Sequence, residues 1–119
     1  MINDKKFDLE DRTTVFGKNV VRFCRSLKQD PINSRICGQL VGSAGSIGAN
    51  YREANDSLGK KDFLHRLKIS RKEAKETIHW LELLLEANQN MEQEISSLKK
   101  EAIELKNILS AIIIKVSDK

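Results

Sequence analysis

Basic side chains recur at helical spacing between residues 61 and 75, and this pattern is the clearest candidate for binding chemistry in the sequence. Steps of four, three, four and three residues place them on one face of a helix, and the residues are Lys61, His65, Lys68, Lys72 and Lys75. A shorter stripe consists of Lys18, Arg22 and Arg25. Such stripes can track phosphate groups, and the release of counterions then makes binding salt-dependent. A solvated helix face produces the same pattern, so both interpretations stay open.

Composition limits what these cations can recognise. Aromatic residues make up only 5% of the chain, so helical faces of this kind cannot easily read base edges, and binding would follow nucleic-acid shape and backbone. The formal net charge is +4, which indicates a local basic patch rather than a generally basic protein. Repetition of the patch in an oligomer would strengthen its positive field.

Catalytic and metal-binding patterns are weak. His65 and His79 share no metal-ligand spacing with each other or with a cysteine, and no Ser-His-Asp or Cys-His spacing suggests a nucleophile. The stretch from Gly42 to Gly48 resembles a phosphate loop, but it lacks the following Lys-Ser/Thr and lies within a helical period. Cys24 and Cys37 are interpreted as small buried hydrophobic residues. We therefore expect no enzyme activity, no metal and no cofactor.

Four segments with helical apolar periodicity must position these residues. They are predicted to cover residues 9–28, 33–54, 60–88 and 91–116. The short turns between them predict an all-α, antiparallel up-down-up-down four-helix bundle, formed as a single domain over residues 1–119. One long dimeric coiled coil is the alternative, and the clear turn signals between the segments disfavour it.

The chain of 119 residues is 39% hydrophobic, which is enough for a core. No run approaches the roughly 18 to 20 apolar residues of a membrane span, and the first residues lack the apolar region of a signal peptide. We expect a cytoplasmic protein with no membrane partner.

An uncharged stretch from Ile36 to Tyr51 interrupts a chain that is 32% charged. Its glycines lie inside a predicted helix, where four of them cost roughly 3–4 kcal/mol relative to Ala. Close contact between helices can offset this cost, because glycine lets backbones approach. One face of small residues is predicted to form a subunit interface, and it consists of Gly38, Gly42, Gly45 and Ala49.

Three aromatic residues lie off the main apolar seams, namely Tyr51, Phe63 and Trp80. We expect them to anchor the same subunit contact, with stacking on exposed bases as the alternative. Polar residues also interrupt the seams, and these are Ser43, Ser46, Asn50 and Arg71. They are predicted to form an interior network that fixes helix register, with a small polar site inside the bundle as the alternative.

Two segments carry a family resemblance. The run from Ser46 to Ala54 reads SIGANYREA, and Asp62-Phe63 and the run KEAKETIHWL from Lys72 to Leu81 follow it. This pattern resembles the bacterial four-helix bundle proteins known as 23S rRNA-intervening sequence proteins. The resemblance implies assembly as a ring, typically a homopentamer, and no catalytic residues. Related accessory proteins of diversity-generating retroelements share the ring form and work with a reverse transcriptase and RNA.

Three functional hypotheses follow. The first is a non-enzymatic oligomeric scaffold that binds RNA, DNA or a nucleoprotein partner without sequence specificity through a basic helix face. The alternative is a protein–protein adaptor with no nucleic-acid role. A third is an enzyme that uses the polar patch around Ser46, Asn50 and Arg71.

Overall fold

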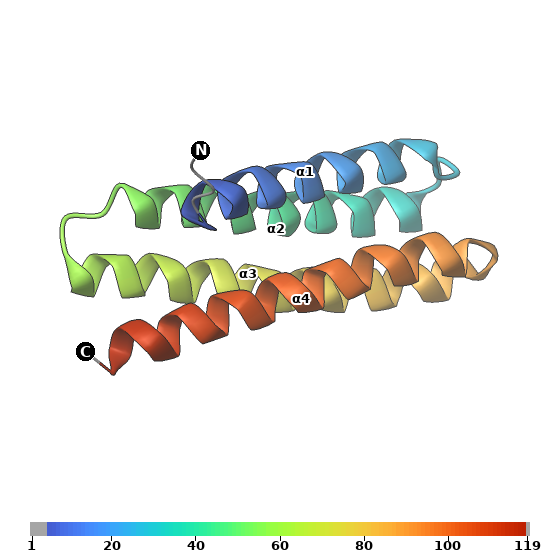
Figure 1. Ribbon diagram of the computed structural model, residues 1–119. Helices are drawn as coiled ribbons and strands as arrows, with labels where there is room; N and C mark the ends of the chain where they lie inside the picture. Colours follow the sequence, from blue (N-terminus) through green and yellow to red (C-terminus); the bar gives the residue numbers. More distant parts are fainter. Residues whose placement is uncertain (1–4, 119) are drawn as a thin grey trace.

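Four long helices build the protein. The structure is a computed structural model that describes residues 5–118, with side chains from Leu9 onward. The elements are α1 (Lys5–Ser26), α2 (Pro31–Asn55), α3 (Lys60–Ala87), the short 3-10 turn η1 (Gln89–Met91) and α4 (Glu92–Ser117). They pack side by side, and the chain turns back at each connection (Figure 1). No strand occurs in this part of the chain. The predicted all-α four-helix bundle is confirmed.

Helix α2 begins two residues earlier than the periodicity predicted, because Asp30 and Pro31 form its start. The Asp30 carboxylate accepts a hydrogen bond from the backbone N–H of Asn33 at 2.8 Å, which satisfies one of the free donors of a helix N-terminus. Pro31 follows in the first turn, where its fixed φ suits a helix and its missing N–H is not needed.

The backbones of α1 and α2 approach closely at glycine. A Cβ atom added to Gly48 would lie 2.9 Å from Oγ1 and 3.3 Å from Cβ of Thr13. A second approach lies about one helical turn away on both helices, where a Cβ on Gly17 would lie 3.9 Å from Cα of Gly45. The sequence-based expectation of close helix contact is therefore met at Gly48.

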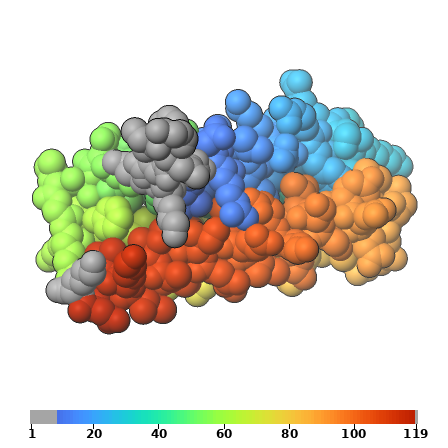
Figure 2. All heavy atoms as spheres, viewed as in Figure 1, coloured from blue at the N-terminus to red at the C-terminus, as the bar shows by residue number. Residues whose placement is uncertain are grey.

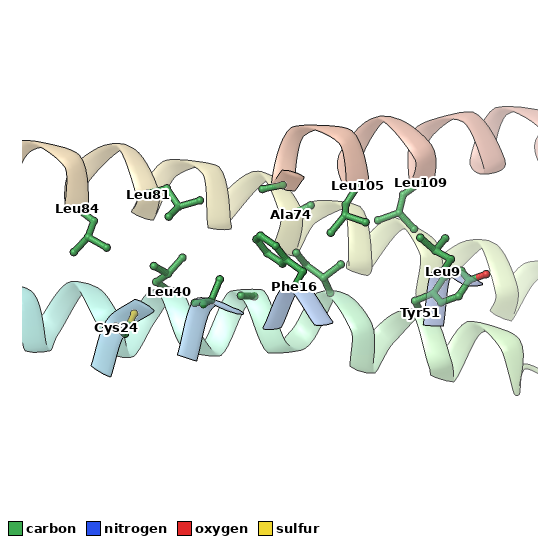
Figure 3. Packing of buried hydrophobic residues seen from close by; sticks show 14 of the residues in the cluster. Leu9, Phe16, Cys24, Leu40, Tyr51, Ala74, Leu81, Leu84, Leu105 and Leu109 are labelled. Atoms are coloured by element: carbon green, nitrogen blue, oxygen red, sulfur yellow. The ribbon is translucent and has the colours of Figure 1, made fainter. Parts of the chain in front are cut away.

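Large apolar side chains from all four helices fill the interior (Figure 3). Helix α3 packs against both α2 and α4, so its buried face is wider than one stripe. Arg71 was predicted to lie in the apolar seam of this helix, whereas Ser70, Thr77 and Leu84 are fully buried there. Ile78 and Leu85 pack at the edge of the core.

Two buried amides tie the ends of the bundle together. Nδ2 of Asn33 donates to Oδ1 of Asn88 at 3.1 Å, and Nδ2 of Asn88 donates to Oδ1 of Asn33 at 2.8 Å. The connection between α1 and α2 is thereby held against the end of α3. Among the described residues, every buried side-chain nitrogen and oxygen atom has a hydrogen-bond partner, as expected for a well-formed interior.

None of the helices in residues 5–118 combines the length and hydrophobicity that a membrane-spanning segment needs.

We expect Gly48→Ala to destabilise the fold, since its new methyl group would collide with the Thr13 side chain. Overpacking of this kind typically costs about 1–3 kcal/mol and exceeds the gain of about 1 kcal/mol in helix propensity. The matched control is Asn107→Ala at an exposed site of α4, which gains helix propensity without a collision. In urea denaturation, the midpoint of unfolding should be lower for Gly48→Ala than for the wild type. The control variant should show no such decrease. Equal midpoints would contradict the assigned contact.

Candidate nucleic-acid and subunit interfaces

The basic stripe on α3 lies on the outer face of the bundle. All five of its side chains are exposed, as their helical spacing requires when Leu67 and Ala74 face inward. The ion pairs within the described part of the chain join Arg12, Arg52 and Lys99 to glutamates, and none of them includes a residue of the stripe. Within the described residues, no carboxylate contacts the four lysine ammonium groups of the stripe directly.

A carboxylate borders this stripe. Partial burial and the nearby Glu76 carboxylate raise the pKa of Glu73, against the opposing effect of the Lys72 ammonium. Because its pKa is raised, Glu73 becomes neutral at a higher pH than an ordinary glutamate. As the pH falls, the negative charge beside the stripe is therefore lost earlier than that of an ordinary glutamate.

The shorter basic stripe lies on a different side of the subunit. Lys18, Arg22 and Arg25 are exposed on α1, and within the described chain α1 packs against α2 and α4 but not against α3. Figure 2 shows α1 and α4 covering the near face, with most of α3 hidden behind them. One subunit therefore cannot present both stripes as a single continuous surface.

A groove between α1 and α2 brings together two predicted sets of residues. It has a volume of about 570 Å³, with small residues, two valines and cations along it, among them Gly45, Gly48, Ala49, Val21, Val41, Lys18 and Arg22. Arg52 also lines the groove and pairs with Glu10 at 3.1 Å. Two predicted interface residues, Gly45 and Ala49, thus share a groove with two predicted nucleic-acid contacts, Lys18 and Arg22.

The small-residue face of α2 continues beyond this groove. Gly38, Gly42, Gly45 and Ala49 are all exposed, and a Cβ added to any of the three glycines would meet nothing within 4 Å. Val21 and Val41 beside them are 42% and 36% exposed. Packing inside one subunit accounts for Gly48 and leaves the other three glycines of α2 unexplained.

The predicted aromatic anchors occupy unlike environments. Tyr51 was expected off the seam, but it is only 3% exposed and belongs to the core, because it shares the inward face of α2 with Ala44 and Ile47. Phe63 and Trp80 are half-buried and pack against the core. The Trp80 ring makes an edge-on contact with His79, with centroids 5.0 Å apart.

Sequence reasoning missed a cavity of about 780 Å³, lined on its apolar side by Leu9, Tyr51, Phe63, Ile108 and Ile112 among others. It opens near the C-terminal half of α4, where α4 diverges from α1 (Figure 1). No pattern within a single segment of sequence could predict this cavity, because residues from four helices line it.

Arg12 links α1 to α4 beside this cavity. Its guanidinium binds both carboxylate oxygens of Glu101, at 2.7 and 2.8 Å, and Glu104 at 2.9 Å. The hydrogen bond to Glu101 and then that to Glu104 raise the pKa of Arg12 further, against partial desolvation. The geometry is that of a strong bidentate pair, although its exposure limits its contribution to stability.

The interior polar network has different members from those expected. Ser43 is buried, and its hydroxyl lies 2.9 Å from that of Thr77. Ser70 donates to the Ile47 carbonyl at 2.7 Å, which joins α3 to α2 directly. The sequence-based prediction of the network did not include Ser70 or Thr77. Their spacing of seven residues, which places two hydroxyl groups on one helix face, could have indicated them.

Ser46, Asn50 and Arg71 lie at partly exposed edges rather than in the interior. Nδ2 of Asn50 donates to the Ser46 carbonyl at 2.9 Å, a local contact within α2. Ser46 lies about 100° around α2 from the buried Ile47, and Arg71 lies the same angle around α3 from the buried Ser70, so both remain at the rim of the contact. A long side chain such as Arg71 can then carry its charge to solvent.

Among the described side chains, no group of three or more His, Cys, Asp or Glu residues could hold a metal ion.

Comparison with known proteins finds a matching family and similar solved structures. The profile of a family described as 23S rRNA-intervening sequence protein matches residues 5–111. A similar solved structure is the 1.70 Å crystal structure of a protein with unknown function from the S23 ribosomal protein family, from Bacteroides thetaiotaomicron VPI-5482. The two chains are 31% identical, the match covers 92% of this chain and 98% of the other, and the TM-score is 0.81. No curated protein matches.

We expect Thr77→Val to lower stability by about 1–2 kcal/mol, because it removes a buried hydroxyl that contacts both Ser43 and the Glu73 carbonyl. Arg71→Leu, six residues away on the partly exposed edge of the same helix, should change stability by less than about 0.5 kcal/mol. Chemical denaturation measures both. A larger loss for Arg71→Leu than for Thr77→Val would overturn the revised membership of the network.

Proposed function

Because the chain belongs to the 23S rRNA-intervening sequence protein family, we propose that it is a non-enzymatic oligomeric scaffold that binds RNA or DNA through the basic face of α3. The observation that carries this proposal is the row of exposed cations on α3 that form no salt bridge among the described residues. Cations on a straight, outward helix can follow phosphates without reading bases. Binding is therefore non-specific, and a nucleoprotein is an equally suitable partner.

The proposed assembly is a ring of antiparallel up-down-up-down bundles, with five subunits. Its support within the subunit is the open small-residue face of α2. Each glycine within a helix costs about 1 kcal/mol relative to alanine, and no neighbour inside the subunit requires Gly38, Gly42 or Gly45. Contact with a second subunit would offset that cost, since small residues let helices approach closely. We assign the groove between α1 and α2 to this contact.

This assignment separates two roles. Lys18 and Arg22 line the groove, so they belong to the subunit contact in the proposed ring. The α3 stripe lies on another side of the subunit and stays available. Repetition of the stripe around the ring multiplies the positive field that attracts a polyanion. We place the protein in the cytoplasm, where cysteines are reduced in the absence of an added oxidant.

We expect replacement of Lys61, Lys68, Lys72 and Lys75 together by Gln to weaken binding to structured RNA and duplex DNA. Each lost phosphate contact should reduce the slope of log affinity against log salt by about 0.9 for a duplex and about 0.7 for a single strand. Fluorescence anisotropy across a salt series measures both affinity and slope.

The matched control replaces Lys28, Lys100 and Lys115 together by Gln, which removes three exposed cations that belong neither to the α3 stripe nor to the groove between α1 and α2. Circular dichroism should show the same helicity for both variants. If the α3 variant binds like the wild type at matched salt, the stripe is a solvated face. No binding by the wild type at low salt would favour the protein–protein adaptor.

We expect Gly42→Leu to break the ring, because a large side chain on the small-residue face prevents close approach of the neighbouring subunit. Light scattering should give the wild type the mass of five 13.5 kDa chains and the variant a smaller mass. Asn107→Leu, which adds the same side chain at an exposed site on α4, should leave the mass unchanged. A monomeric wild type, or an unchanged mass for Gly42→Leu, would contradict the interface.

A further inference from the structure

The two cysteines of the chain face each other across α1 and α2. The close approaches already described pair Thr13 with Gly48 and Gly17 with Gly45. Steps of three and four residues continue this contact line along α1 to Cys24 and back along α2 to Cys37. The two positions are therefore in register on the facing sides of neighbouring helices.

Further observations agree with this register. Cys24 and Cys37 line the same small cavity, which has a volume of about 210 Å³. Burial, and then the neighbouring Cys37 thiol, raise the pKa of Cys24, so the two thiols are near enough to influence each other's ionisation. Figure 3 shows the sulfur of Cys24 beside the ribbon of α2.

Features on both sides of the pair keep α1 and α2 close together. The pair lies between the glycine contact of Gly17 with Gly45 and the connection of residues 27–30, which joins the two helices. A disulfide needs the two Cα atoms within about 4.4–6.8 Å, which neighbouring helices reach only where small residues and a short connection hold them together. The small-residue contact lies on one side of this pair, and the short connection lies on the other.

We propose that Cys24 and Cys37 form a reversible intrachain disulfide, which makes the α1–α2 hairpin a site of redox modification. The proposal is independent of nucleic-acid binding. A peroxide is the oxidant, and Cys37 reacts first because it is partly exposed whereas Cys24 is buried.

The reaction balances in two steps. The Cys37 thiolate attacks hydrogen peroxide, the O–O bond breaks, and a sulfenic acid forms with release of hydroxide. The Cys24 sulfur, after losing its proton, attacks the Cys37 sulfur. The S–S bond forms as the S–O bond breaks, and a second hydroxide leaves. The two hydroxide ions take up the two thiol protons, so the products are one disulfide and two water molecules. A dithiol reductant reverses the oxidation.

The first test is intact-mass analysis of the whole protein. Reduced protein is treated with hydrogen peroxide, denatured and alkylated with iodoacetamide. The oxidised chain should be lighter by two hydrogen atoms and take up no alkyl group, while treatment with dithiothreitol before alkylation should restore two alkylated sites. Cys24→Ser and Cys37→Ser are the matched controls, and neither can lose two hydrogens within one chain.

Two results of this test would overturn the proposal. One is addition of oxygen atoms to the wild type while Cys24 remains alkylatable. The other is a disulfide found only between two chains.

A second measurement needs no variant. The disulfide would restrict the unfolded chain, so the oxidised protein should melt at a temperature roughly 5–15 °C above the reduced protein, and reduction should remove the difference. A lower melting temperature for the oxidised chain would contradict the register, because it would mean that closing the bond distorts the hairpin.

Discussion

The backbone contact between α1 and α2 at Gly48 is the constraint on which the rest of the subunit depends. With no Cβ at this position, the Thr13 side chain rests directly on α2, and the two helices take one register. That register sets the groove between them, turns Tyr51 toward the core and brings Cys24 opposite Cys37. A larger residue at Gly48 would separate the helices and alter all three features together, because interiors are close-packed.

Glycine serves two purposes on α2, and the structure distinguishes them. Gly48 is required by packing within the subunit, whereas Gly38, Gly42 and Gly45 lie on an open face. A helix that carries glycine without a contact to offset its propensity cost is less stable than an alanine-rich one. The propensity cost of the open face is therefore not offset within the isolated subunit. The neighbouring valines add an apolar surface to this face.

The basic residues lie on different sides of the subunit. Lys18 and Arg22 of α1 border the small-residue groove, and the lysines of the α3 stripe lie on another side. Arg12 is different in kind, because its guanidinium is held by Glu101 and Glu104 and ties α1 to α4. Cations that are already paired position helices, whereas unpaired ones such as Lys68 remain free to attract a polyanion.

The sequence by itself determined the helices, since apolar periodicity and turn residues act over a few neighbouring positions. It also indicated the exposure of the α3 stripe and the small-residue face, because one helix period decides both. Tertiary structure alone decided that Ser70 and Thr77, rather than Arg71, lie inside, and that Tyr51 is a core residue. These outcomes depend on how far each helix is rotated toward two neighbours at once. The same packing made a facing pair of Cys24 and Cys37, which thirteen residues of separation on two different helices could not reveal.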